Sequence, residues 1–196
     1  MKPNPKVYVG IDSALAFTGL AALLVPAGAS TAKLLRTHTI QTEPKSDQSD
    51  RLVLIWQGVR RFVLSCMHDG AVPNKGGVGI EGFSFGDKFR KYDLGASAAA
   101  ARLAVAAASR DIRIEVVSPQ KAKAAVCPKW HGSNKDNWIA AGGKPDKFKR
   151  SMPTKDAVQA DLWSRLGFDV RGEHEADAVA VALHLAIQAG ATAPER

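Results

Sequence analysis

The chain has 196 residues, 45% of them hydrophobic, and a formal net charge of +8. It is long enough to bury a core without disulfides, and no apolar run approaches the about 20 residues that a membrane helix needs. The N-terminus has no apolar signal core and the two cysteines stand apart, so we expect a cytoplasmic protein without membrane association. The positive charge favours a polyanionic partner, although charge alone identifies none.

The first segment, residues 6–12, has the pattern of a strand with a buried face and ends in a carboxylate. Valines and an isoleucine alternate with Tyr8 and Gly10, and Asp12 closes the run. An unpaired carboxylate at the end of a central strand would be costly, and a divalent cation would neutralise it. The alternative is that Asp12 caps the following turn. The segment alone does not decide between the two.

Strand and helix patterns then alternate along the chain, which predicts one α/β domain, residues 1–196, with a mixed central sheet and helices on both faces. Asp50 is expected to cap the first helix, and Pro153 to stand in the first turn of the fourth. After the first strand, the expected strands cover residues 18–26, 33–42, 78–81 and 113–117. The expected helices cover residues 50–68, 94–109, 120–126, 153–166 and 173–189.

Residues 127–152 break this alternation, with a Gly-Gly pair, two prolines and no clear period. A connection of this length is either functional or disordered. Its aromatic residues alternate with basic ones, which suits stacking on bases and neutralisation of phosphates. The alternative is a solvated insertion whose tryptophans pack back on the domain. The residues that carry the DNA-binding hypothesis are Lys129, Trp130, Lys135, Trp138, Lys147, Lys149 and Arg150.

Two more acidic segments accompany Asp12. Glu81 ends a short apolar strand, and Glu173, Glu175 and Asp177 open the last helix, together with a histidine at position 174. Residues 173 and 174 share a face with Asp177, whereas Glu175 points to the opposite side. The helix dipole accounts for Glu173 and Glu175, but not for Asp177, whose neighbours are apolar. The carboxylates and the histidine predict a pair of divalent-metal sites.

Six short motifs follow one another in a fixed order along nearly the whole chain, and each is weak alone. They are Gly10-Ile11-Asp12 with Thr18-Gly19, Arg51-Leu52, Ile80-Glu81-Gly82-Phe83, Leu94-Gly95, Ala101-Arg102, and residues 174–183. The ordered set resembles the RuvC family of Holliday junction resolvases, within the ribonuclease H-like superfamily. The resemblance implies a ribonuclease H-like fold, a homodimer, and an endodeoxyribonuclease that hydrolyses phosphodiesters in branched DNA by paired nicks.

The resemblance also implies a catalytic metal site. Asp12, Glu81 and Asp177 would be ligands, with His174 at the fourth position, for two Mg²⁺ ions per active site that Mn²⁺ could replace. In the two-metal scheme the ions lie about 3.5–4 Å apart, one activating the attacking water and the other stabilising the leaving oxygen. Asp12 is the candidate to bridge them. An alternative role for His174 is to handle the proton of the water.

Further DNA contacts follow from the same resemblance. Lys155 is the candidate for the family's phosphate-contacting lysine, and Phe83 and Phe85 lie near its base-stacking aromatic residue. The chain has Ser13-Ala14 where the family often has Pro-Gly, and residues 127–152 are longer than the usual equivalent. A compact, basic variant of this kind fits the cytoplasm of a bacterial cell or of a phage-infected host. The remaining cations expected at the DNA are Lys88, Arg90, Lys121 and Lys123.

Two other functions remain open. An actin-like or sugar-kinase-type phosphate-binding protein also begins with a strand, an Asp and a Thr-Gly, but it needs a second phosphate loop and a longer chain. A catalytically inactive branched-DNA-binding module would keep the positive charge and the insertion. The presence of all three carboxylates argues against the inactive module.

Overall fold

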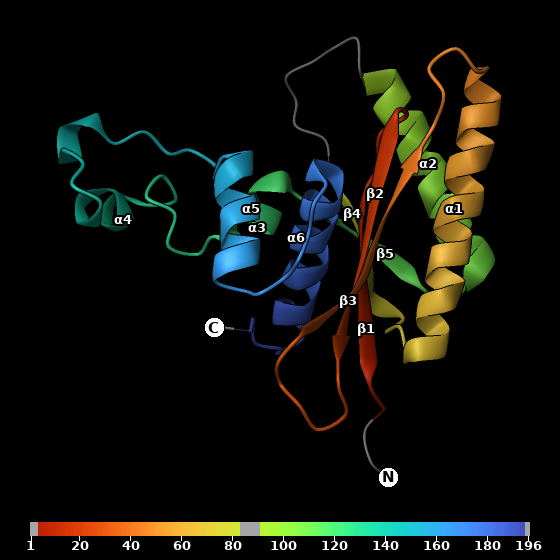
Figure 1. Ribbon diagram of the computed structural model, residues 1–196, viewed down its shortest axis with the longest axis horizontal. Coiled ribbons are helices and arrows are strands. Elements are labelled where there is room, and N and C mark those ends of the chain that lie inside the picture. The colour runs from red at the N-terminus through yellow and green to blue at the C-terminus, as the bar shows by residue number, and fades with distance from the viewer. Residues whose placement is uncertain (1–3, 83–90, 195–196) are drawn as a thin grey trace.

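The computed structural model describes residues 4–82 and 91–194 (Figure 1). A five-stranded sheet in the order β3-β2-β1-β4-β5 lies at its centre. β1 pairs antiparallel with β2 and parallel with β4, so the sheet is mixed, as expected. β2 and β3 are antiparallel, and β4 and β5 are parallel. The strands are β1 (Lys6–Asp12), β2 (Phe17–Val25), β3 (Lys33–Gln41), β4 (Lys75–Glu81) and β5 (Arg113–Val117).

Helices cover both faces of the sheet, as the alternating sequence pattern predicted (Figure 1). The α1 helix (Gln48–Asp69) and the α2 helix (Lys91–Ala108) lie on one face. The other face packs against α6 (Glu173–Gln188), and α3 (Pro119–Val126) and α5 (Lys155–Ser164) lie against α6. None of the helices that the structure describes combines the length and apolar character needed to cross a membrane.

The α6 helix crosses close to β1 and β2 because glycines on these strands leave room for its backbone. A Cβ added at Gly10 would overlap the carbonyl oxygen of Ala178, and one at Gly19 would overlap that of His174. A residue with a side chain at either position would push the helix away from the sheet. The close approach brings the first turns of α6 next to the end of β1, where Asp12 lies.

Several helix starts differ from expectation by one to three residues, and two of these differences change the expected role of a residue at the helix start. The α1 helix begins at Gln48 and is capped by Asp47, whose carboxylate accepts a hydrogen bond from the Ser49 N–H at 2.7 Å, so Asp50 is not the cap. The α5 helix is capped by Thr154, so Pro153 precedes the cap rather than standing in the first turn. Capping residues are frequent near both starts, and sequence alone does not select among them.

Residues 127–152 form a protruding arm that extends beyond α3 and α5 (Figure 1). The arm contains the α4 helix (Lys135–Ala140) and a 3-10 turn, η1 (Pro145–Lys147), in a segment that shows no periodic sequence pattern. Asn134 caps α4 by accepting a hydrogen bond from the Asn137 N–H at 2.8 Å. A helix of this length is too short to show an amphipathic repeat, which explains why the pattern did not reveal it.

Candidate active site

Asp12, Glu81 and Asp177 meet at one edge of the sheet. Asp12 ends β1 and Glu81 ends β4, and these strands are parallel neighbours, so their carboxyl ends lie together. Asp177 reaches the same place from the second turn of α6. One carboxylate oxygen of each residue lies within 4.8 Å of the others, and all three side chains are half-buried.

Three carboxylates at this separation cannot all carry a charge without a compensating cation. Burial, together with the nearby charges of Asp12 and Asp177, raises the pKa of Glu81 to about 8. Burial also raises the pKa of Asp177, against the opposite influence of Lys123. The single nearby lysine does not balance three carboxylates, and their oxygens are donors of the kind that Mg²⁺ prefers.

Lys123, which was expected among the cations at the DNA, lies beside the acidic cluster. Its Nζ is 3.7 Å from Oδ1 of Asp177, and the two side chains are only 12% and 14% exposed. The α3 helix, which carries Lys123, packs against α6, which carries Asp177. Its place follows from this helix contact, which no sequence pattern revealed.

A pocket of about 240 Å³ opens beside the cluster, and Asp12, Glu81, Lys123 and Met152 all contribute to its lining. Ser13 lines it too, is only 4% exposed, and its hydroxyl finds no hydrogen-bond partner within the described residues. A buried hydroxyl without a protein partner normally binds water or an ion. The orphan hydroxyl and the acidic oxygens together fit a hydrated divalent cation.

His174 lies between Asp12 and Phe17. Its Nδ1 is 2.8 Å from Oδ2 of Asp12, and this hydrogen bond raises the pKa of the imidazole. The ring stacks on Phe17, with centroids 5.5 Å apart and planes 13° apart. When Nδ1 carries the proton that it donates to Asp12, Nε2 retains a lone pair that can accept a proton or bind a metal. Phe17 was not foreseen as part of the site, because nothing in its strand distinguishes it.

The two other acidic residues of α6 have partners outside the cluster. Glu173 is exposed and forms an ion pair with Lys155 at the start of α5. Glu175 accepts hydrogen bonds from the hydroxyl groups of Thr37 and Thr39, each at 3.1 Å, and so ties α6 to β3. Neither glutamate is among the three carboxylates that meet.

The other residues expected at the DNA are on α3, in the arm, or outside the described residues. Lys121 is exposed on α3, near the half-buried His184. The seven residues expected between positions 127 and 152 all belong to the arm. Outside the described residues lie Phe83, Phe85, Lys88 and Arg90.

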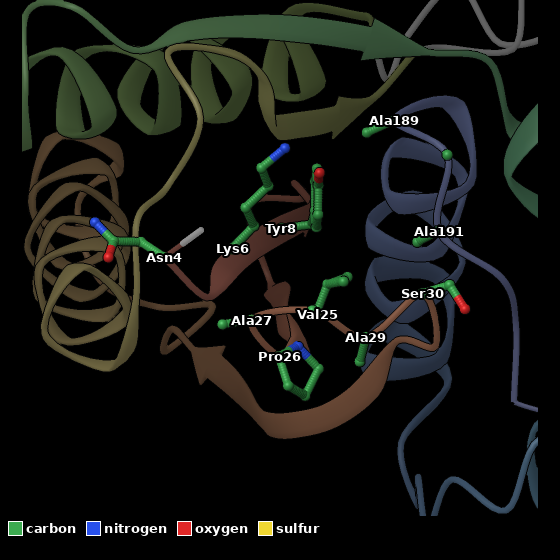
Figure 2. Close-up of a pocket in the computed structure, with 12 residues that line it drawn as sticks. Asn4, Lys6, Tyr8, Val25, Pro26, Ala27, Ala29, Ser30, Ala189 and Ala191 are labelled. Atoms are coloured by element: carbon green, nitrogen blue, oxygen red, sulfur yellow. The ribbon is translucent and has the colours of Figure 1, made fainter. Parts of the chain in front are cut away.

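A separate pocket of about 250 Å³ lies at the opposite end of β1 (Figure 2). Lys6 and Tyr8 of β1, the turn between β2 and β3, and the residues after α6 form its lining, which contains no carboxylate. Lys6 is six residues before Asp12, or about 20 Å along an extended strand. This pocket therefore offers no comparable metal ligands and is distant from the acidic cluster.

The sequence matches no family model, and no curated protein matches it. Among solved structures, RuvC from Thermus thermophilus has a TM-score of 0.65 at 22% identity, with 96% of this chain and 99% of that chain covered. The structure of T. thermophilus RuvC in complex with a Holliday junction substrate gives the same TM-score and coverage at 23% identity. The chain therefore has a RuvC-like fold, which confirms the ribonuclease H-like architecture expected from its sequence.

Proposed function

We propose that this protein is a metal-dependent endonuclease that resolves Holliday junctions by paired nicks. The observation that carries the proposal is the meeting of Asp12, Glu81 and Asp177 at one edge of a RuvC-like sheet. Branched DNA is the proposed substrate because the similar T. thermophilus RuvC structure contains a Holliday junction, and because this chain is strongly basic. Residues 1–196 would form a single nuclease domain from which the arm protrudes.

Magnesium, replaceable by manganese, is the proposed cofactor, with two ions per active site. Asp12, Glu81 and Asp177 would hold it, with His174 as the fourth group. When bound, the metal would supply an activated water and stabilise charge on the leaving oxygen. Among the protein groups, His174 orients Asp12 through their hydrogen bond, and Lys123 places a positive charge beside Asp177 at the pocket.

Two nicks in opposite strands need two active sites, so we propose a homodimer. An apolar groove between α1 and α2 supports this proposal, since large apolar patches on a surface often mark protein contacts. Leu103 in this groove is 65% exposed, and Val53 is 51% exposed. In analytical ultracentrifugation, Leu103→Glu should shift the protein from dimer to monomer. An unchanged mass would show that the dimer contact lies outside this groove.

The deciding experiment is cleavage of a synthetic four-way junction, labelled on each strand in turn, with Mg²⁺ and with EDTA. We expect symmetric nicks that a ligase can reseal in Mg²⁺, and none in EDTA. A linear duplex of the same sequence should be cut far more slowly. Tight junction binding without cleavage in Mg²⁺ or Mn²⁺ would instead support the inactive DNA-binding module.

A further inference from the structure

The arm uses its aromatic residues to hold itself together. The rings of Trp130 and His131 have centroids 4.0 Å apart, and those of His131 and Trp138 are 5.7 Å apart. Phe148 meets Trp138 edge-on at 6.4 Å. All four side chains are half-buried although the arm protrudes, so these rings form a small cluster within the arm, and Trp130 joins this cluster to the main core of the domain.

Hydrogen bonds close the arm at its base and fix its far turn. The Ser151 N–H donates to the carbonyl oxygen of Gly132 at 2.9 Å, and the indole N–H of Trp130 donates to the Ser151 hydroxyl at 3.4 Å. The indole N–H of Trp138 donates to the carbonyl oxygen of Lys144 at 2.9 Å. These hydrogen bonds all lie within the arm itself, and both indole donors are already engaged.

The cations of the arm, in contrast, all face the solvent. Within the part of the chain that the structure describes, none of them forms an ion pair with a carboxylate. Six cations and two acids, Asp136 and Asp146, give the arm a net charge of +4, half of the +8 of the whole chain. The six cations are Lys129, Lys135, Lys144, Lys147, Lys149 and Arg150.

The base of the arm adjoins the candidate active site. The arm begins directly after α3, which carries Lys123, and ends at Met152, which lines the same pocket as Asp12 and Glu81. From this base it extends away from the sheet, past α3 and α5 (Figure 1). DNA with a phosphodiester at the acidic cluster would therefore have a flanking segment within reach of the arm.

We propose that the arm is a pre-folded contact for the phosphate backbone of double-stranded DNA beside the cut, and that its aromatic residues are its core rather than stacking platforms for bases. That a cut lies beside the arm rests on the proposed function. The ring contacts and the exposed cations of the arm are observed independently of it. Phosphates are the same in every sequence, so this contact adds affinity to junction arms and linear duplexes alike.

Salt dependence separates phosphate contacts from base stacking. On double-stranded DNA each neutralised phosphate adds about 0.9 to the slope of log K against log salt, whereas stacking releases no counterions. Binding of fluorescein-labelled junction and linear duplex should be measured by anisotropy in EDTA across a series of NaCl concentrations. The arm triple variant combines Lys147→Gln, Lys149→Gln and Arg150→Gln. It should bind both DNAs more weakly and reduce the steepness of the salt slope by up to about 2.7.

A control with the same change in net charge is Lys33→Gln, Lys45→Gln and Arg110→Gln, three exposed cations away from the arm. This control should leave the slope within about one unit of wild type. An arm triple variant with an unchanged slope would overturn the proposal.

Trp138 tests the role assigned to the rings. Trp138→Ala keeps every charge but removes the centre of the ring cluster, so it should lower both the affinity and the slope. Trp138→Phe keeps a ring and should lie closer to wild type. Weaker binding of Trp138→Ala at an unchanged slope would instead indicate stacking and would overturn the proposal.

Cleavage distinguishes a failure of the arm from a failure of the proposed function. In Mg²⁺, wild type and the Lys33, Lys45 and Arg110 control variant should cut a four-way junction at similar rates, whereas the arm triple variant should need more protein for half-maximal cleavage. If no protein cuts the junction but the slopes change as expected, the arm contact stands and the proposed function fails. If the junction is cut but the slopes do not change, the proposed function stands and the arm contact fails.

Discussion

The acidic edge of the sheet and the arm hold their charged side chains in opposite ways. Asp12, Glu81 and Asp177 come from three elements of the main core and are half-buried, and burial together with neighbouring charge raises the pKa of Glu81 and of Asp177. The cations of the arm stand on a small ring cluster, face water, and lack acidic partners within the described residues. Buried charges interact strongly over short distances, whereas exposed charges are screened by salt and act nearly independently. Substitutions at the acidic edge should therefore change the rate, and those on the arm should change affinity.

The strongest way to break this comparison is Asp12→Asn. The amide keeps the shape of the side chain but removes the charge of a proposed metal ligand, so we expect cleavage to fall by at least roughly 10³-fold. Junction binding in EDTA should stay near wild type, because the substitution removes no phosphate-contacting cation. Single-turnover cleavage and anisotropy measure the two quantities.

The matched control is Asp146→Asn, the same chemical change on the arm, which should leave the rate unchanged. Retained turnover of Asp12→Asn in Mg²⁺ would refute the catalytic assignment. An equal loss of cleavage rate in Asp12→Asn and Asp146→Asn would show that the acidic edge and the arm do not have separate roles.

The next largest effect should distinguish His174 from Glu173. His174 bonds to Asp12, while Glu173 is exposed and paired with Lys155. We expect His174→Ala to slow cleavage by about 10²–10⁴-fold and Glu173→Gln to be nearly silent. His174→Asp should retain partial activity, because a carboxylate can also hold magnesium. Single-turnover rates that show an inactive Glu173→Gln and an active His174→Ala would reverse the assignment.

Sequence patterns were sufficient to predict the strands of the sheet and to single out the three carboxylates, because both predictions depend on local periodicity. Asp12 and Glu81 end short apolar runs, and parallel pairing of such strands places their ends together. The position of Lys123 was missed, since it depends on the packing of α3 against α6. Phe17 was missed for the same reason, because its contact with His174 joins residues far apart in the chain.

The acidic edge should also make the metal-free protein less stable as the pH rises. Glu81 has a folded pKa of about 8 against an ordinary value of 4.5, so between these values the folded state keeps a proton that the unfolded chain has released. The free energy of unfolding must then fall with increasing pH. The raised pKa of His174 acts in the same direction above its ordinary value of 6.5. Urea unfolding in EDTA from about pH 5 to pH 8 measures this decrease.

Glu81→Gln should flatten that pH profile, because it removes the carboxyl group with the displaced pKa. Mg²⁺ should restore stability near pH 8 and have little effect near pH 5, since metal binding requires ionised ligands. A wild-type profile that is flat or rises over this range would contradict the assignment of the proton to Glu81.

The smallest expected effect concerns the anchoring of α6 at the acidic edge. Glu175→Ala leaves the hydroxyl groups of Thr37 and Thr39 without their carboxylate acceptor. Water can replace part of this interaction at a half-buried site, so we expect a loss of about 1–2 kcal/mol in the free energy of unfolding. Glu173→Ala is the matched control, because it removes another acidic side chain from the same first turn but only an exposed ion pair with Lys155, which contributes little. Urea unfolding at pH 7 in EDTA compares the two, and equal stabilities would show that the threonine contacts do not anchor the helix.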